Sequence, residues 1–201
     1  MKSSSEIEEI CKKYNIENYT INDDDSIDVD GEVYLGRAGL TELPLDFNKV
    51  TGDFNCSSNF LTTLKGSPKY VGDTFNCSDN ELVSLKYCPE EVIGNFRCEE
   101  NKLTSLEYGP IKVGIDLYYT DNKLRDLYGI SNHISGYLFI RKNPIASVVG
   151  TLISDIHFIR AFNSYRVIKD DKVVLRRLKY VMEAFDMKYD LEKIKEYYEI
   201  I

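Results

Sequence analysis

Three cysteines of this sequence recur at a fixed interval, and an asparagine follows each of them three residues later. The interval from Cys56 to Cys77 equals that from Cys77 to Cys98, and thiols gathered in this way could ligate a metal ion or exchange a disulfide. A structural zinc site usually takes paired C-x-x-C or histidine ligands, which are missing around these residues. The same column continues as Tyr119 and Ile140, which can replace a buried apolar group but not a thiolate. We therefore expect the cysteines to pack in a core, and we expect no metal site.

The other residues capable of chemistry do not form a recognisable catalytic set. The acidic run at residues 23–31 is similar to a calcium loop, but Ser26 stands where the first aspartate belongs and Arg37 where the closing glutamate belongs. A solvent-exposed hairpin is the better interpretation. His133 and His157 have no cysteine or Ser-x-Gly nucleophile near them in sequence. Glycine-rich nucleotide loops and H-E-x-x-H motifs are absent, so we expect neither an enzyme nor a cofactor.

The cysteine column is one of several columns that share the same period. Asparagine recurs at this interval from Asn59 to Asn143 without a slip, and apolar residues keep step with it. A fixed period of this length predicts stacked units that each need their neighbours to bury an apolar face. The apolar columns contain Phe54, Phe75, Phe96, Leu117 and Leu138; Leu61, Leu82, Leu103, Leu124 and Ile145; Leu64, Leu85, Leu106, Leu127 and Val148; and Val71, Val92, Val113 and Ile134.

Within each unit, the order of apolar residues, asparagine and leucine resembles the leucine-rich repeat. The 21-residue length and the "LTSL" step at Leu103 are most similar to the short bacterial class, and phrases such as "VTGDFNCSSN" resemble bacteriophage-encoded members. The resemblance implies an α/β repeat solenoid with about six repeats over residues 32–157 and one parallel strand per repeat. Because the return segments contain Gly and Pro, we expect an extended or turn-like convex side. The asparagines are expected to hydrogen-bond loop backbone.

The segments that flank the repeats have the character of end caps. Residues 1–31 begin with a serine-capped helical pattern and continue into an acidic hairpin, which predicts an N-terminal helix-hairpin cap. Residues 158–201 contain two apolar stripes at helical spacing, which predicts a C-terminal helical cap. Both caps would cover core that the ends of a solenoid otherwise expose.

Charge and hydropathy restrict the classes of partner. The formal net charge of −8 argues against the broad attraction to phosphate backbones that a nucleic-acid binder needs. No apolar window approaches a membrane span, and the N-terminus lacks the pattern of a signal peptide. The odd cysteine count fits a reducing compartment. We expect a cytoplasmic protein that does not bind membranes, located in the host cell if a bacteriophage encodes it.

The residues that vary between repeats are those expected on the outward side of the strands. In leucine-rich repeat proteins, the concave sheet surface is the usual binding site, so the resemblance assigns partner binding to these positions. Small polar residues fill the early repeats, whereas aromatic, Arg and acidic residues gather in the later ones. Aromatic and Arg side chains dominate protein-interface hot spots. The predicted contact residues are Tyr34, Arg97, Glu99, Asp116, Tyr118, Asp121, Tyr137, Phe139 and Arg141.

Two functions from different classes remain open. The first is a non-enzymatic module that binds a protein through the concave face, as a bacteriophage accessory protein that inhibits a host defence protein would do. The alternative is a small-ligand or nucleotide binder that uses a groove between the late repeats and a basic C-terminal cap. In the alternative, an anion or an acidic partner would contact Arg160, Arg176 and Arg177. The outward aromatic residues also have an explanation that needs no partner, namely that neighbouring side chains or the C-terminal cap cover them.

Overall fold

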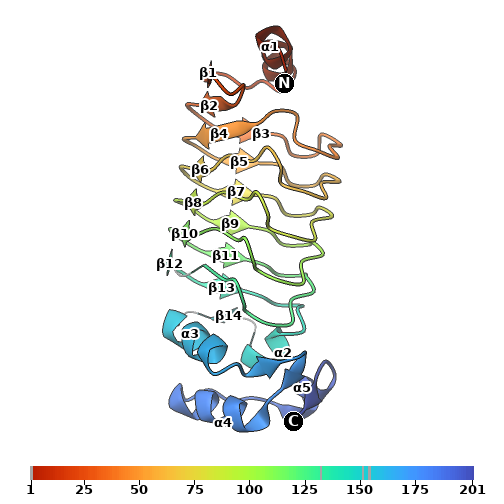
Figure 1. Cartoon of the computed structure of the whole chain (residues 1–201), viewed down its shortest axis with the longest axis vertical. Helices are drawn as coiled ribbons and strands as arrows, with labels where there is room; N and C mark the ends of the chain where they lie inside the picture. Colours follow the sequence, from red (N-terminus) through yellow and green to blue (C-terminus); the bar gives the residue numbers. More distant parts are fainter. Residues whose placement is uncertain (1, 132, 151, 154) are drawn as a thin grey trace.

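The protein is a β-solenoid built from stacked turns of nearly equal length (Figure 1). The computed structural model describes residues 2–131, 133–150, 152–153 and 155–201. Two sheets of seven strands each run along the stack, and their buried side chains join in one hydrophobic core. The stacked parallel strands confirm that the repeated sequence period marks a repeat protein.

Sheet B contains the strands that the repeat pattern predicts. Adjacent strands pair in parallel with a shift of one full repeat, so Phe54 lies opposite Phe75 and Phe75 opposite Phe96. Each of these strands buries its first residue, because alternate side chains of a strand point to opposite faces. The parallel strands are β3 (Val33–Tyr34), β5 (Phe54–Asn55), β7 (Phe75–Asn76), β9 (Phe96–Arg97), β11 (Leu117–Tyr118) and β13 (Leu138–Phe139).

Sheet A is formed by the return segments and corrects the expectation of one strand per repeat. Val71, Val92 and Val113 anchor short strands that pair in parallel and point into the core. Pro68 and Pro89 each lie two residues before such a strand, where they remove no ladder hydrogen bond. The strands are β1 (Tyr19–Ile21), β2 (Ile27–Val29), β4 (Phe47–Val50), β6 (Tyr70–Val71), β8 (Glu91–Val92), β10 (Lys112–Val113) and β12 (His133–Ile134).

The cysteine column is part of the core. Cys56, Cys77 and Cys98 are fully buried beside a stack of Phe rings, and Tyr119 continues the column with its ring 5.8 Å from that of Phe96. Burial raises the pKa of the Cys56 and Cys77 thiols well above the usual range, so these thiols stay protonated. In the part of the chain that the structure describes, no cluster of three or more His, Cys, Asp or Glu side chains is placed to hold a metal ion.

The asparagine column forms a ladder of hydrogen bonds that connects successive turns. The Asn80 side chain donates to the carbonyls of Cys56 and Cys77 at 3.1 and 3.2 Å, and its oxygen accepts from the backbone N–H of Leu61 at 2.9 Å. Asn59 and Asn101 repeat this arrangement one turn earlier and one turn later. The predicted structural role of these asparagines is therefore confirmed.

The N-terminal residues form the helix and the hairpin that the sequence predicts. Helix α1 (Ser4–Lys13) begins with a capping box in which Ser3 and Glu6 bond each other's backbone, and it buries Ile7 and Cys11. Strands β1 and β2 pair antiparallel and extend sheet A beyond β4. The acidic residues between them occupy the hairpin turn, as expected.

The C-terminal residues interrupt the repeat and then add helices. After α2 (Ala146–Val149), strand β14 (Leu152–Ile153) runs antiparallel to β13 and ends sheet B. The remaining elements are α3 (Ile156–Ser164), β15 (Ile168–Lys169), β16 (Lys172–Val173), α4 (Leu175–Ala184), α5 (Leu191–Lys195) and β17 (Glu199–Ile200). Among the described residues, no helix combines the length and the apolarity that crossing a membrane requires.

Arg125 connects the C-terminal residues to the last repeats through several contacts. Its guanidinium donates to the carbonyl of Tyr197 at 2.5 Å, lies 4.8 Å from the centre of the Tyr198 ring and forms an ion pair with Asp171. The Tyr198 hydroxyl in turn donates to the Arg125 carbonyl at 2.6 Å. These contacts join residues that are far apart in sequence, which holds the C-terminal segment in a defined place on the solenoid.

The neighbouring residue Asp126 gives a pH-dependent prediction. Burial raises the pKa of this carboxyl, and the charges of Asp171 and Glu107 raise it further. A folded-state pKa above the unfolded value of about 3.9 means that the ionised form costs stability at neutral pH, and that this cost disappears as the pH falls. We therefore expect Asp126→Asn to raise the melting temperature near pH 7, with the advantage lost at or below about pH 4.

Thermal unfolding followed by circular dichroism at several pH values measures this effect. Asp186→Asn removes the same charge from an exposed position and serves as the control. An Asp126→Asn variant that is equally stabilised at every pH, or destabilised near neutral pH, contradicts the explanation.

Candidate functional site

The outward face of sheet B carries the predicted contact residues. Each strand places its second residue outward, and the parallel register aligns Arg97 with Tyr118 and Tyr118 with Phe139. Asn76 is the next residue along this row. Side chains one repeat apart in sequence therefore become direct neighbours. We call the group formed by Arg97, Glu99, Asp116, Tyr118, Tyr137 and Phe139 the aromatic stack.

The rings and the guanidinium of the stack lie on one another. The Tyr118 and Phe139 rings are almost parallel, with centres 4.6 Å apart and an interplanar angle of 2°. On the other side, the Arg97 guanidinium lies 5.1 Å from the Tyr118 ring centre, within the range of a cation–π contact. The ring of Tyr137 packs against Phe139 at 6.2 Å, and Tyr137 is 48% exposed. Neighbouring side chains thus cover part of each ring and leave part of the stack open.

Asp116 holds one edge of the stack. One carboxylate oxygen accepts from the Tyr118 hydroxyl at 3.1 Å, and the other accepts from the backbone N–H of Tyr137 at 2.7 Å. A side chain at Gly136 would collide with this carboxylate, since a Cβ there would lie 2.1 Å from it. Burial and the bond to Asp116 both raise the pKa of Tyr118, so its hydroxyl remains a donor.

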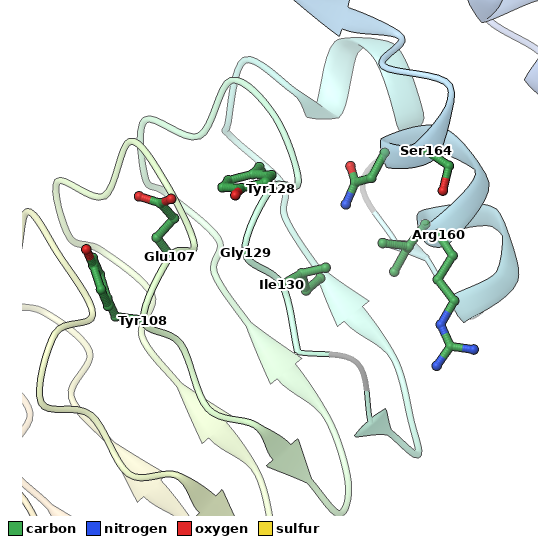
Figure 2. A pocket seen from close by; sticks show the side chains of 9 residues that line it. Glu107, Tyr108, Tyr128, Gly129, Ile130, Arg160 and Ser164 are labelled. Atoms are coloured by element: carbon green, nitrogen blue, oxygen red, sulfur yellow. The ribbon is translucent and has the colours of Figure 1, made fainter.

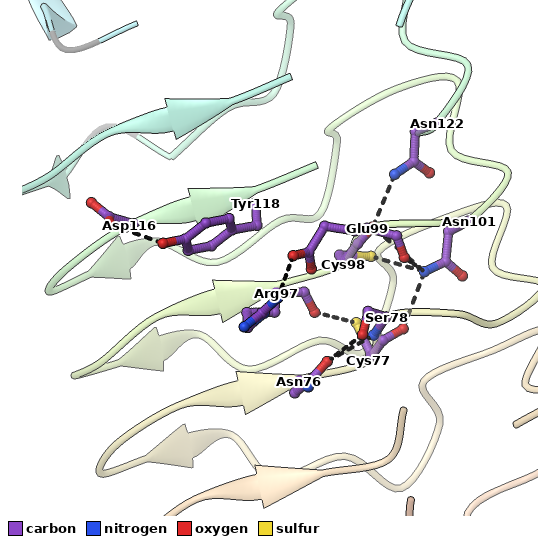
Figure 3. Close-up of polar contacts among 10 residues, drawn as sticks. All are labelled: Asn76, Cys77, Ser78, Arg97, Cys98, Glu99, Asn101, Asp116, Tyr118 and Asn122. Carbon is purple, nitrogen blue, oxygen red and sulfur yellow. Dashed lines mark hydrogen bonds and ion pairs between the residues drawn. The ribbon is translucent and has the colours of Figure 1, made fainter. Parts of the chain in front are cut away.

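Glu99 holds the other edge through Arg97. The two side chains form an ion pair of 2.8 Å, visible in Figure 3 beside the bond between Asp116 and Tyr118. The Glu99 side chain is 13% exposed, and its second oxygen is buried without a hydrogen-bond partner among the described residues. This pair partly neutralises the only cation within the stack, which makes the stack a rigid aromatic surface with acidic edges.

The remaining predicted contact residues lie outside the stack. Tyr34 is 63% exposed on β3, at the opposite end of sheet B. Asp121 forms an ion pair of 2.5 Å with Lys142, and Arg141 is exposed after β13. The structure therefore brings six of the nine predicted residues together, places Asp121 and Arg141 beyond them, and separates Tyr34 from the rest.

The groove that the alternative function requires corresponds to a cleft beside α3 (Figure 2). This cleft has a volume of about 480 Å³ and is lined by Arg160 and Ser164 on one side and by Tyr108 and Tyr128 on the other. Ile130 and Ile159 add apolar lining. Arg176 and Arg177 do not line it; Arg176 is exposed on α4, and Arg177 donates to the carbonyl of Arg166 at 3.1 Å. The basic cluster expected from the sequence is thus divided.

The sequence-based prediction missed the tyrosines at the cleft. Tyr108 is 68% exposed and Tyr128 is 63% exposed. Tyr108 also adopts a left-handed backbone conformation (φ 64°), as does Tyr87 one turn earlier (φ 72°). The signal in the sequence was that Tyr87 and Tyr108 lie one repeat period apart in the return segments, next to the Gly and Pro residues that indicate turns.

Comparisons with known proteins identify no relative. The chain matches no protein-family model, no curated protein and no solved structure.

Proposed function

We propose that this chain is a non-enzymatic protein-binding solenoid of the leucine-rich repeat type, with caps at both ends, that presents the aromatic stack to a partner protein. The observation that carries the proposal is the partly open row of Arg97, Tyr118 and Phe139 on a regular sheet. Arg and aromatic residues are the types that dominate interface hot spots. Their rigid arrangement lowers the entropy lost on binding, because the side chains are already ordered.

Self-packing of the rings is the competing explanation for the stack. It accounts for the contact between Tyr118 and Phe139, but not for the exposure of Tyr137. Strands β5 and β7 show that the fold does not need an aromatic residue at this position, since Asn55 and Asn76 occupy the same column. An aromatic group that the scaffold does not need favours a role in recognition.

The biological setting is part of the proposal. The resemblance of the repeats to those of bacteriophage proteins favours an accessory protein that binds a host protein, such as one used in antiviral defence, in the cytoplasm of the infected cell. Inhibition would follow from covering a surface of that protein or from stabilising one of its states, and neither needs a catalytic residue.

Affinity capture from bacterial lysate tests the proposal. The tagged wild type is compared with a Tyr118→Ala, Phe139→Ala variant and with a Tyr108→Ala control, which removes an exposed tyrosine from a different surface. We expect quantitative mass spectrometry to find a protein that the wild type and the control retain and that the stack variant loses. Equal capture by all three chains would show that the stack is not the binding site.

A second candidate function is favoured by the cleft beside α3. Its volume of about 480 Å³ lies within the range of small-molecule sites, and it combines apolar lining from Ile130 and Ile159 with the cationic side chain of Arg160. A small anionic ligand, such as a nucleotide, would be bound there. Under this hypothesis Arg160→Ala abolishes nucleotide binding in calorimetry, while the stack variant retains it.

A further inference from the structure

The partner of the aromatic stack can be characterised from the charges of the surrounding face. In sheet B from β5 to β13, each strand with the one residue before it and the three residues after it contains, in total, six carboxylates and three cations, a net charge of −3. The carboxylates are those of Asp53, Asp79, Glu99, Glu100, Asp116 and Asp121, and the cations are those of Arg97, Arg141 and Lys142.

The ion pairs on this face leave mainly acidic residues without a counter-charge. Arg97 pairs with Glu99 and Lys142 pairs with Asp121, so two of the three cations are already neutralised. Asp53, Asp79, Glu100 and Asp116 form no ion pair with any described residue. Asp116 accepts from the Tyr118 hydroxyl and from the Tyr137 backbone, and Glu100 is exposed in the turn after Arg97. Arg141, two residues after Phe139, is the one cation of this set without an ion pair to a described residue. The face around the stack therefore has four carboxylates and one cation without an ion pair to a described residue.

Aromatic rings on a face with an excess of carboxylates are a favourable environment for a cation. The negative face of a ring attracts a guanidinium or ammonium group, and Arg97 already makes this contact with Tyr118 at 5.1 Å. Phe139 and Tyr137 offer further aromatic surface next to Asp116. A guanidinium from a partner would find the same kind of ring together with an acceptor, whereas a phosphate or an acidic peptide would be repelled.

We propose that the partner docks on this face through a basic, Arg-rich segment, which rests on the proposed protein-binding function. Arginine is favoured over lysine because its planar guanidinium can stack on a ring while its N–H groups bond a carboxylate. The acidic flanks would speed association by electrostatic steering, and the aromatic rings would slow dissociation.

Labelled twelve-residue Gly-Arg, Gly-Lys and Gly-Glu peptides are the probes, and fluorescence anisotropy measures their binding to the full chain. We expect the Arg peptide to bind about tenfold more tightly than the Glu peptide at low salt, and the Lys peptide to lie between them. The double variant Asp116→Asn, Glu100→Gln should lower the affinity for the Arg peptide by about fivefold or more. Phe139→Ala should also lower this affinity, without any change in charge.

The control variant separates a specific site from general attraction to an acidic protein. Glu183→Gln with Asp186→Asn removes the same number of charges from the C-terminal region and should leave the affinity unchanged. Equal weakening by both double variants, equal affinity for Arg and Glu peptides, or no binding of the Arg peptide overturns the inference. If capture from lysate depends on the stack while the peptides show no preference, only this inference fails; if capture is independent of the stack, the proposed function fails.

Discussion

Asn80→Ala is expected to destabilise the solenoid by about 3 kcal/mol, because it leaves a buried backbone N–H without an acceptor. The Asn80 oxygen accepts from Leu61 N–H at 2.9 Å, and both residues are buried. The carbonyls to which Asn80 donates keep other donors, since Asn59 still reaches that of Cys56 and Asn101 that of Cys77. The orphaned Leu61 N–H therefore dominates the loss, and the small cavity left by the amide adds to it.

Asn76→Ala is the matched control for this prediction. Asn76 lies four residues earlier on the outward face, and its oxygen accepts from the Ser78 N–H and hydroxyl at 3.0 and 2.7 Å in a half-exposed setting. Water can replace these bonds, so the loss should stay below about 1 kcal/mol. Urea denaturation followed by circular dichroism measures both variants. Similar losses for Asn76 and Asn80 would contradict the role given to the ladder.

Gly114→Ala is expected to cost about 3 kcal/mol or more through overpacking between adjacent turns. A Cβ at this position would lie 2.0 Å from the carbonyl oxygen of Ile93, which belongs to the backbone of the preceding turn. Backbone that is fixed by ladder hydrogen bonds on both sides cannot move aside without breaking them. Gly72, two repeats before Gly114, approaches the backbone of Thr51 in the same way, so this close contact between turns recurs along the solenoid.

Gly39→Ala separates close approach from backbone strain. No atom lies within 4 Å of a Cβ at Gly39, but its φ of 69° is left-handed, which costs an alanine about 1 kcal/mol. The free energy of unfolding should therefore fall much less than in Gly114→Ala. A Gly114→Ala variant no less stable than Gly39→Ala would show that the turns can separate.

Much of the fold could be predicted because the buried positions accept few residue types. Phe75, Cys77 and Asn80 each have a chemical reason to recur, since a core position or a ladder position tolerates few substitutes. Their period predicted the stacking, and the alternation within each unit predicted sheet B. The second strand of each repeat, which belongs to sheet A, was not predicted because Gly and Pro indicated turns there. The regular recurrence of Val71 and Val92 was nevertheless a signal for this strand.

The backbone conformation of the turns could not be predicted from residue types. The residue before each of the five ladder asparagines is left-handed, as is Arg37 at the equivalent position before Ala38, with φ between 53° and 60°, yet none of these six residues is glycine. Stacking imposes this conformation, because Ser58 N–H and Asn59 N–H both bond carbonyls of the next turn, at 2.9 and 3.1 Å. These positions are Arg37, Ser58, Asp79, Glu100, Asp121 and Lys142.

The candidate site was predictable where it follows the period and not where it depends on side-chain conformation. The proximity of Arg97, Tyr118 and Phe139 follows directly from the parallel register. The partial neutralisation of Arg97 by Glu99 does not, because it needs the actual rotamers. The cleft beside α3 was expected as a groove that contains Arg160, but its tyrosines were not expected, since Tyr128 and Arg160 are brought together only by the packing of the C-terminal residues on the repeats.

Site-specific photo-crosslinking tests the central claim most directly. A benzoylphenylalanine placed at Asn76 lies on the sheet B face next to Arg97 without altering the stack, and one placed at Tyr108 lies at the cleft. With the captured protein present, we expect a covalent adduct from the Asn76 position and none from the Tyr108 position. An adduct from the Tyr108 position alone would contradict the claim that the aromatic stack is the binding surface.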